Sequence, residues 1–392
     1  MVQTNARFVV LEPSKVGVQH ITLLEGYLRA LLALDIAADG LELVYRADPS
    51  SYAALAEDVR RRVPLDAIAV RDPNARQWIR KIAQELRATF GALRSIADGD
   101  VLLITCLSSP SLLCFELCNS LIGRKHVVVV LHSEMEALFD DGMRSWRSWG
   151  FWAWQWSRVR ERGSRLGVAV VAEFIREALT SAMPEKFKER EIAVLPIPVQ
   201  PNRTPPDRTG RHRIAFIGYR SRFKGFEVFQ RLASSPESFQ LEFAVIGGGS
   251  IEILPSEKRK ALESANAYHA EIACSSIAVF PYTEGYVASL SAAALDALAA
   301  GVHIVATRRP CFQWIGRELG DTFVTLVDSE TDFAALVADD AFLTRVRNGA
   351  NRRLQLLGDS EFGADATQRA FAEILARAGH PRDRRPNRSE AE

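Results

Sequence analysis

The chain has 392 residues, 47% of them hydrophobic and 25% charged, which is enough for two globular domains of ordinary size. A formal net charge of +1 gives no general attraction to nucleic acid, so we expect no nucleic-acid partner. The five cysteines are scattered, which predicts buried thiols and no bound metal. Because the chain has neither a basic, apolar leader nor a run of about 18 apolar residues, we expect a cytoplasmic protein.

In the first half of the chain, apolar runs of strand length alternate with helical patterns, which is typical of an α/β domain with parallel strands. The predicted strands are 8–11, 41–45, 101–105, 127–131, 168–171 and 192–195. Helices are predicted over 22–34 and 111–121 and from Glu173 onward. We therefore expect residues 1–197 to form a Rossmann-like domain.

Five prolines between residues 196 and 210 indicate a linker, which we place at 198–211. A second Rossmann-like domain is expected over 212–360. Its predicted strands are 214–217, 241–246, 277–280 and 302–306, and its predicted helices are 227–233, 257–268 and 292–300. A final helix lies within 361–378, and the charged residues 379–392 are expected to be disordered. Two doubly wound domains leave a cleft between the carboxyl ends of their sheets, where such folds bind ligands.

The segment from Gly218 to Gly225 joins the end of a predicted strand to the start of a helix through a basic loop. Glycines permit close backbone approach, helix amino-terminal ends attract anions, and Arg220, Arg222 and Lys224 add cations. The segment predicts a diphosphate site. A solvated loop that is basic by chance is the alternative.

A second segment, 281–307, carries a helix that Ser291 can cap and that Gly301 ends. Small residues from Ala292 onward leave the free amides at the helix tip open to a ligand. Asp296, in the second turn, is placed to accept hydrogen bonds from a nucleoside ribose. An alanine-rich helix packed closely on a sheet would look similar, but it leaves Asp296 without a role.

At these two segments the chain resembles the GT-B glycosyltransferases, specifically family 4 of the retaining enzymes. That family pairs Gly-Arg-x4-Lys-Gly with a later Glu-Gly-Phe-Gly and Glu-Ala-x-Ala-x-Gly. Here Gly218 and Lys224-Gly225 keep the first spacing, and residues 296–301 match the last element. The order of elements over nearly the whole chain also fits, with a final helix that in such proteins crosses back to the first domain.

The resemblance implies transfer of a sugar from a nucleotide diphosphate donor, such as a UDP- or GDP-sugar, to a hydroxyl of a glycan or lipid-linked acceptor. The configuration of the sugar would be retained, and no cofactor or metal is implied. The second domain would hold the nucleotide and the first would bind the acceptor. The residues expected to bind the nucleotide are Gly17, Gly218, Gly225, Ser289, Ser291, Ala292 and Asp296, and those expected to act in catalysis are Lys224, Arg220, Arg222, His132 and Glu284.

The chain also departs from the family pattern. Tyr219 stands where the family has arginine, and His303 stands where proline is usual. The family places two acids eight residues apart, whereas Glu284 and Asp296 are twelve apart. Either the loop is longer and Glu284 still contacts the donor sugar, or the acid on the sugar side is absent.

Two positions in the first domain complete the expected site. Gly17 lies in a turn, 15–20, that corresponds to a glycine-containing turn facing the cleft in the family. His132 ends a buried strand and resembles the family's histidine near the donor hexose. A structural role for His132 remains the alternative, and His20 carries a weaker signal.

The altered acid spacing and Tyr219 also fit a second hypothesis. In that hypothesis the chain is a non-catalytic, nucleotide-binding or scaffold relative in a glycan-assembly complex. A sugar-nucleotide epimerase on the same fold is a third hypothesis. It needs acid and base residues flanking the sugar, and the sequence offers no second clear acid for that role.

Five of the seven tryptophans lie within eleven residues, 146–156, and arginines are interleaved with them. The pattern predicts an amphipathic helix with Trp146, Trp149, Trp152 and Trp156 on one face and arginines opposite. That indole face could complete the core of the first domain. Indoles also favour the headgroup region of a bilayer, and basic faces are drawn to anionic lipid. We therefore expect peripheral binding to an anionic membrane surface through Trp146–Arg165.

Overall fold

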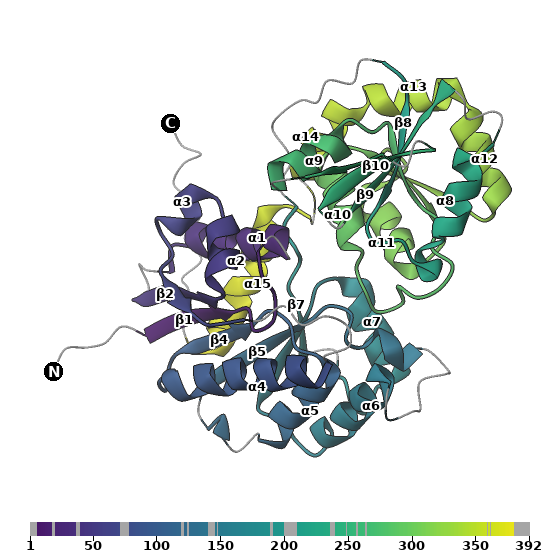
Figure 1. Cartoon of the computed structure of the whole chain (residues 1–392). Coiled ribbons are helices and arrows are strands. Elements are labelled where there is room, and N and C mark those ends of the chain that lie inside the picture. The colour runs from purple at the N-terminus through teal and green to yellow at the C-terminus, as the bar shows by residue number, and fades with distance from the viewer. Residues whose placement is uncertain are drawn as a thin grey trace.

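The computed structural model describes residues 6–17, 20–36, 40–70, 78–118, 121–123, 125–139, 146, 148–188, 191–199, 210–235, 240–247, 249–255, 258–262, 265–358, 360 and 362–379. The chain forms two α/β lobes, each built on its own sheet (Figure 1). Most of the predicted linker and nearly all of the predicted tail lie outside the described residues.

The sheet of the first lobe is parallel throughout and has the strand order β3-β2-β1-β4-β5-β6-β7. Its strands are β1 (Ala6–Leu11), β2 (Leu41–Ala47), β3 (Leu65–Ala67), β4 (Val101–Ile104), β5 (His126–Leu131), β6 (Leu166–Val170) and β7 (Ile192–Val194). Its helices are α1 (Ile21–Ala33), α2 (Pro49–Ala54), α3 (Glu57–Arg60), α4 (Trp78–Ser95), α5 (Ser109–Leu117), α6 (Trp149–Arg160) and α7 (Glu173–Ala182). The strand order reverses between β1 and β4, and ligands of open α/β sheets bind outside such a reversal.

The second sheet has the order β11-β10-β9-β8-β12-β13-β14, and its direction of winding reverses between β8 and β12. The strands are β8 (Arg213–Ile217), β9 (Glu242–Gly247), β10 (Ser250–Leu254), β11 (Lys258–Ala261), β12 (Ile277–Phe280), β13 (His303–Thr307) and β14 (Val324–Val327). The helices are α8 (Phe226–Ala233), α9 (Ala265–Ala273), α10 (Ala292–Ala299), α11 (Pro310–Leu319), α12 (Glu330–Ala338), α13 (Asp340–Asn348) and α14 (Ala350–Gly358).

The helix predicted over 257–268 is wrong in its first half. β10 and β11 form an antiparallel pair at the edge of the second sheet, and α9 begins only at Ala265. The pairing satisfies the backbone groups of this polar stretch within the sheet, so tertiary context overrides its helix-forming composition. Gly247 ends β9 and Gly249, with a φ of 73°, lies in the turn into β10.

The last helix, α15 (Ala364–Arg377), leaves the second lobe and packs on the first (Figure 1). Phe371 is fully buried there, with its ring centre 5.9 Å from that of Phe8 and 5.5 Å from that of Tyr27. The lobes also meet directly where Phe174 of α7 contacts Trp314 of α11, with ring centres 5.4 Å apart. The crossing of α15 and the contact between α7 and α11 therefore both connect the two lobes.

Candidate active site

Lys224 lies at the carboxyl end of β8, at the reversal point of the second sheet. Gly218 leaves β8 with a φ of 116°, and the amine of Lys224 sits 3.0 Å from the position that a Cβ on Gly218 would occupy. Burial lowers the pKa of Lys224, and no carboxylate of a described residue pairs with its amine. A partly buried cation without a counter-ion suits an anionic ligand.

The two arginines of the same loop differ in their surroundings. Arg220 forms an ion pair with Glu252 of β10, and its guanidinium lies 5.1 Å from the ring centre of Phe226. Arg222 begins a short 3₁₀ turn, η5 (Arg222–Lys224), and its side chain is exposed. Both arginines are exposed, but Arg220 is already paired with a carboxylate of the protein.

The structure brings the two sequence motifs into contact. Gly225 has a φ of 65°, and a Cβ there would lie 1.9 Å from the carbonyl oxygen of Pro281, so no larger residue fits. The backbone N–H of Thr283 donates to the carbonyl of Phe223 at 3.0 Å. The role of Gly225 is thus to let the basic loop pack against the segment that follows β12.

The tip of α10 faces the same region. The hydroxyl of Ser291 accepts a hydrogen bond from the N–H of Ala294 at 3.4 Å, as its predicted capping role requires, and contacts the hydroxyl of Tyr282 at 3.1 Å. Ala292, the first helical residue, is exposed. The start of α10 carries a positive partial charge, and it lies near Lys224 because Ala293 and the Lys224 amine both approach Gly218.

Asp296 is half-buried in the second turn of α10, and Tyr268 of α9 donates its hydroxyl hydrogen to Oδ2 at 3.0 Å. Burial raises the pKa of Asp296, although the nearby His269 and the hydrogen bond from Tyr268 oppose that rise. Tyr268 therefore holds one oxygen of the carboxylate in place. The sequence did not indicate this partner.

The turn between β12 and α10 forms hydrogen bonds with a residue of the first lobe. Glu284 is exposed, and Gly285 and Tyr286 have left-handed φ values of 77° and 61°. Beyond them, the side chain of Ser289 and the backbone of its neighbours bind the carboxylate of Glu136, which begins the 3₁₀ turn η3 (Glu136–Phe139). Sequence reasoning missed Glu136 because nothing in the residues around it distinguishes it from other acids.

On the first lobe, His132 lies at the end of β5, as predicted. Its Nε2 is 2.6 Å from the carbonyl oxygen of Thr105. Since a carbonyl can only accept, Nε2 carries the hydrogen and Nδ1 is left as an acceptor. Burial, together with the charge of His20, lowers the pKa of His132 to about 3, so the ring is neutral near pH 7.

Glu12 is a fully buried carboxylate beside His132 that the sequence did not single out. It accepts hydrogen bonds from the hydroxyl of Thr105 at 2.7 Å and the thiol of Cys106 at 3.4 Å, and it lies 3.8 Å from Nδ1 of His20. Burial disfavours its charge, but these partners outweigh burial and bring its pKa to about 2. Burial raises the pKa of Cys106 well above its usual value, so the thiol keeps its hydrogen and donates it to Glu12.

Gly17 lies in the loop after β1 with a φ of 57°, and its N–H donates to the hydroxyl of Ser50 at 3.0 Å. No described atom outside its chain neighbours approaches its Cβ position within 4 Å. The structure thus places Gly17 at the same sheet edge as His132, on the first lobe. The other predicted nucleotide-binding residues all lie on the second lobe.

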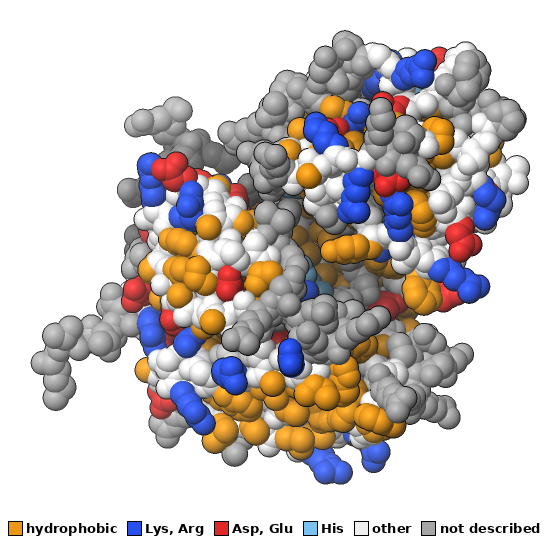
Figure 2. All heavy atoms as spheres, viewed as in Figure 1, with side chains coloured by type: hydrophobic (Ala, Val, Ile, Leu, Met, Phe, Trp, Pro, Cys, Tyr) orange, Lys and Arg blue, Asp and Glu red, His pale blue; other side chains and the backbone are white. Residues whose placement is uncertain are grey.

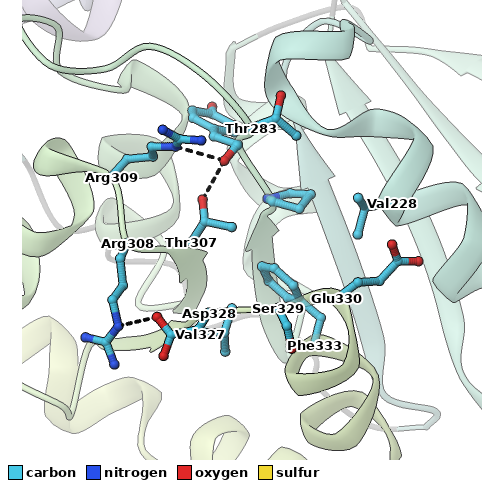
Figure 3. A pocket seen from close by; sticks show the side chains of 12 residues that line it. Val228, Thr283, Thr307, Arg308, Arg309, Val327, Asp328, Ser329, Glu330 and Phe333 are labelled. Carbon is cyan, nitrogen blue, oxygen red and sulfur yellow. Dashed lines mark hydrogen bonds and ion pairs between the residues drawn. The ribbon is translucent and has the colours of Figure 1, made fainter.

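A pocket of about 420 Å³ opens at the carboxyl ends of β12, β13 and β14 (Figure 3). The residues that line it are Val228, Pro281, Tyr282, Thr283, Thr307, Arg308, Arg309, Val327, Asp328, Ser329, Glu330 and Phe333. Arg308 pairs with Asp328 at 2.6 Å, and Nε of Arg309 donates to the carbonyl of Tyr282 at 3.1 Å. None of the predicted site residues lines this pocket, although Tyr282 also contacts Lys224 and Ser291.

The tryptophan-rich segment forms α6, but its indoles do not share one environment. Trp156 is fully buried and donates to Glu116 at 3.1 Å, whereas Trp149 and Trp154 are 39% and 45% exposed. The predicted single indole face is therefore wrong: the buried face instead contains Gly150, Ala153, Trp156, Ser157 and Arg160. Arg144 and Arg147 lie outside the described residues.

Exposed hydrophobic side chains gather on the lower part of the first lobe, where α4, α5 and α6 lie (Figure 2). The large hydrophobic side chains that are exposed on these three helices or next to them are Ile79, Leu117, Leu121, Trp146, Trp149 and Trp154. We call this set the apolar patch. Among the described residues, no helix combines the length and the hydropathy needed to cross a membrane.

Comparison with solved structures identifies the fold. The Anabaena protein HepE in complex with UDP-glucose is similar over 95% of this chain and 99% of its own, with a TM-score of 0.60 and 13% identity. Sucrose-phosphate synthase from Thermosynechococcus elongatus matches over 95% and 98%, with a TM-score of 0.59 and 14% identity. The chain has the GT-B fold of glycosyltransferases.

A glycosyltransferase from Rickettsia africae is also similar, over 95% of this chain and 98% of its own, with a TM-score of 0.54 and 10% identity. No protein-family model matches the chain, and no curated protein matches its sequence. At such low identity the likeness establishes the GT-B architecture, and the chemistry has to be argued from the site itself.

Proposed function

We propose that this GT-B protein is a glycosyltransferase that moves a sugar from a nucleotide diphosphate donor, such as a UDP- or GDP-sugar, to an acceptor hydroxyl with retention. The observation that carries the proposal is the partly buried amine of Lys224, which pairs with no carboxylate of a described residue, beside the exposed tip of α10. HepE, a protein of the same fold, binds UDP-glucose, which supports the choice of donor class.

The proposed chemistry depends on charge. As the glycosidic bond of the donor lengthens, negative charge builds on the departing diphosphate. Lys224, the accessible Arg222 and the amides at the start of α10 would stabilise that charge, so we assign no metal or other cofactor to the step. Asp296 would accept hydrogen bonds from the ribose, and Glu284 would contact the donor sugar.

The first lobe would bind the acceptor, and its His132 would lie near the donor hexose. His132 is neutral, and its Nδ1 is an acceptor, so it can take a hydrogen bond from a sugar hydroxyl. Figure 2 shows a hollow between the two lobes. Closure of the lobes over bound donor would exclude water and limit hydrolysis.

The first test is a thermal-shift panel of UDP, GDP and ADP and their sugars. A nucleotide present at 100 times its Kd should stabilise the folded protein by about 2.7 kcal/mol. We expect one nucleotide series to stabilise the parent and Lys188→Ala, which removes an exposed lysine of the first lobe, but not Lys224→Ala. No stabilisation of the parent by any nucleotide would contradict the proposal.

The acceptor class is a separate proposal, a glycan or lipid-linked glycan at the cytoplasmic face of a membrane. Its support is the apolar patch, in which Leu117 is 64% exposed and Trp149 and Trp154 project from α6 near the exposed Arg158. Exposed indoles beside arginines favour the boundary between acyl chains and anionic headgroups.

Vesicle co-sedimentation at about 0.15 M salt tests this surface, because attraction to a charged bilayer survives partial screening there. We expect binding to anionic and not to neutral vesicles, and loss of binding when both Trp149 and Trp154 become serine. The matched control replaces Tyr219 and Phe223, which are 73% and 59% exposed on the other lobe. Equal indifference to both kinds of vesicle would contradict the membrane proposal.

A further inference from the structure

The carboxylate of Glu136, on the first lobe, accepts hydrogen bonds from a group of donors on the second lobe. Oε1 of Glu136 accepts the N–H of Val287 at 2.9 Å. Oε2 accepts the N–H of Ala288 at 2.7 Å and the hydroxyl of Ser289 at 2.6 Å. These residues are about 150 positions apart in the chain, so the contact exists only when the two lobes are together.

The donors on the second lobe form what we call the amide cradle, the N–H groups of Val287 and Ala288 with the hydroxyl of Ser289. It follows a turn in which Gly285 and Tyr286 both have left-handed φ values. Successive N–H groups in such a turn converge on one point and make a concave site for an anion. Both oxygens of Glu136 are bound there, as the oxygens of a ligand carboxylate or phosphate would be.

The cradle is also close to the proposed donor site. It ends two residues before Ser291, which caps α10, and α10 approaches Gly218 and Lys224 through Ala293. Glu136 therefore places a negative charge next to the groups assigned to the leaving diphosphate. An anionic donor and Glu136 would compete for the same part of the second lobe.

We propose that Glu136 is an internal ligand that closes the amide cradle in the absence of donor and that an anionic group of the donor displaces it. The proposal rests on the proposed function for the identity of that donor. η3, which carries Glu136, packs against α6, so the carboxylate is presented by a supported element. Release of Glu136 would remove one of the contacts that join the lobes and would open the amide cradle to the donor.

The competition predicts a gain of affinity when the carboxylate is removed. An internal ligand lowers the apparent affinity of its competitor by the fraction of molecules in which the site is open. Removal of Glu136 should therefore tighten anion binding by about tenfold, the effect of one hydrogen bond to a charged group.

The experiment measures binding of inorganic pyrophosphate and of UDP by calorimetry to the parent, Glu136→Gln and Glu136→Ala. Glu161→Gln, which removes an exposed acid beyond α6, is the control for net charge. We expect both Glu136 variants to bind pyrophosphate about tenfold more tightly than the parent and the control. Equal or weaker binding by the variants, or no binding to any of the proteins, would overturn the proposal.

Hydrogen exchange of the peptide covering 285–290 distinguishes a local change at the amide cradle from a general loss of folding. The amides of Val287 and Ala288 should exchange faster in Glu136→Ala without ligand, and pyrophosphate should restore their protection. Unchanged exchange would overturn the proposal. If the variants bind pyrophosphate more tightly but no protein binds any nucleotide, Glu136 is still an internal ligand, but the proposal of a nucleotide donor is wrong. The two proposals can therefore fail separately.

Discussion

The amine of Lys224 lies 3.0 Å from the point where Gly218, the residue after β8, would carry a Cβ, so the missing side chain leaves the space that the amine occupies. Gly218→Ala should displace the amine and weaken nucleotide binding by about tenfold, the value of one charged contact. The φ of 116° adds about 1–3 kcal/mol of backbone strain for alanine.

Gly99→Ala is the matched control for that strain. Gly99 has a φ of 94°, and no described atom beyond its chain neighbours would meet a Cβ there. Both variants should lose stability in urea unfolding, but only Gly218→Ala should lose affinity in calorimetry. Equal affinity in the two variants would separate Gly218 from the nucleotide site.

Asp296 is expected to contribute to binding and little to chemistry, because a ribose contact is made equally in the ground and transition states. Asp296→Ala should weaken nucleotide affinity by about tenfold and leave the turnover number nearly unchanged. Tyr268→Phe removes only the hydrogen bond that holds the carboxylate, so its effect should be smaller. If calorimetry gives both variants the affinity of the parent, Asp296 is a structural residue.

Glu284 decides between the two interpretations of the long turn before α10. Its side chain is exposed beside Gly285, at the edge of the amide cradle. If it contacts the donor sugar, Glu284→Gln should slow transfer by about 10²-fold with little change in UDP affinity. Unchanged transfer by this variant would show that the site works without an acid at that position.

Stability should depend on pH through His303, which burial holds at a pKa of about 4 in the folded protein. The unfolded chain protonates histidine near pH 6.5, so the contribution of neutral His303 is complete above that value. It is lost as the pH falls toward 4, because only the unfolded state takes up the proton.

Urea unfolding at pH 7.5 and 5.5 measures that loss. Between these values the parent should lose about 1.4 kcal/mol more stability than His303→Asn, since the other titrating groups are common to both proteins. An equal loss in the two proteins would mean that His303 is protonated in the folded state.

Sequence patterns predict most of this fold because its strands are buried and nearly continuous in apolar residues. Val127–Leu131 and Ile277–Phe280 are examples, and both are strands in the structure. The pattern fails at the sheet edge, where the polar residues 258–261 resemble a helix. Pairing with β10 decides their conformation, and that pairing is a tertiary interaction.

The candidate site likewise has some features that local sequence predicts and others that only the fold determines. Ser291 was identified as a cap because capping is a local relationship between residues three apart. The ion pair of Arg220 with Glu252 and the contact of Glu136 with Ala288 join segments far apart in the chain, and no local sequence signal marks either of the two glutamates. Local sequence therefore predicts which residues can bind an anion, and the fold decides which of them are already engaged.

The most direct measurement is release of nucleoside diphosphate from a stabilising nucleotide sugar, compared between the parent and Lys224→Ala at matched folded concentration. If Lys224 stabilises the leaving group, the parent should release the diphosphate in the presence of acceptor, and the variant should be slower by about 10²–10³-fold. Release at the same rate by both proteins would contradict the assignment of the site to sugar transfer.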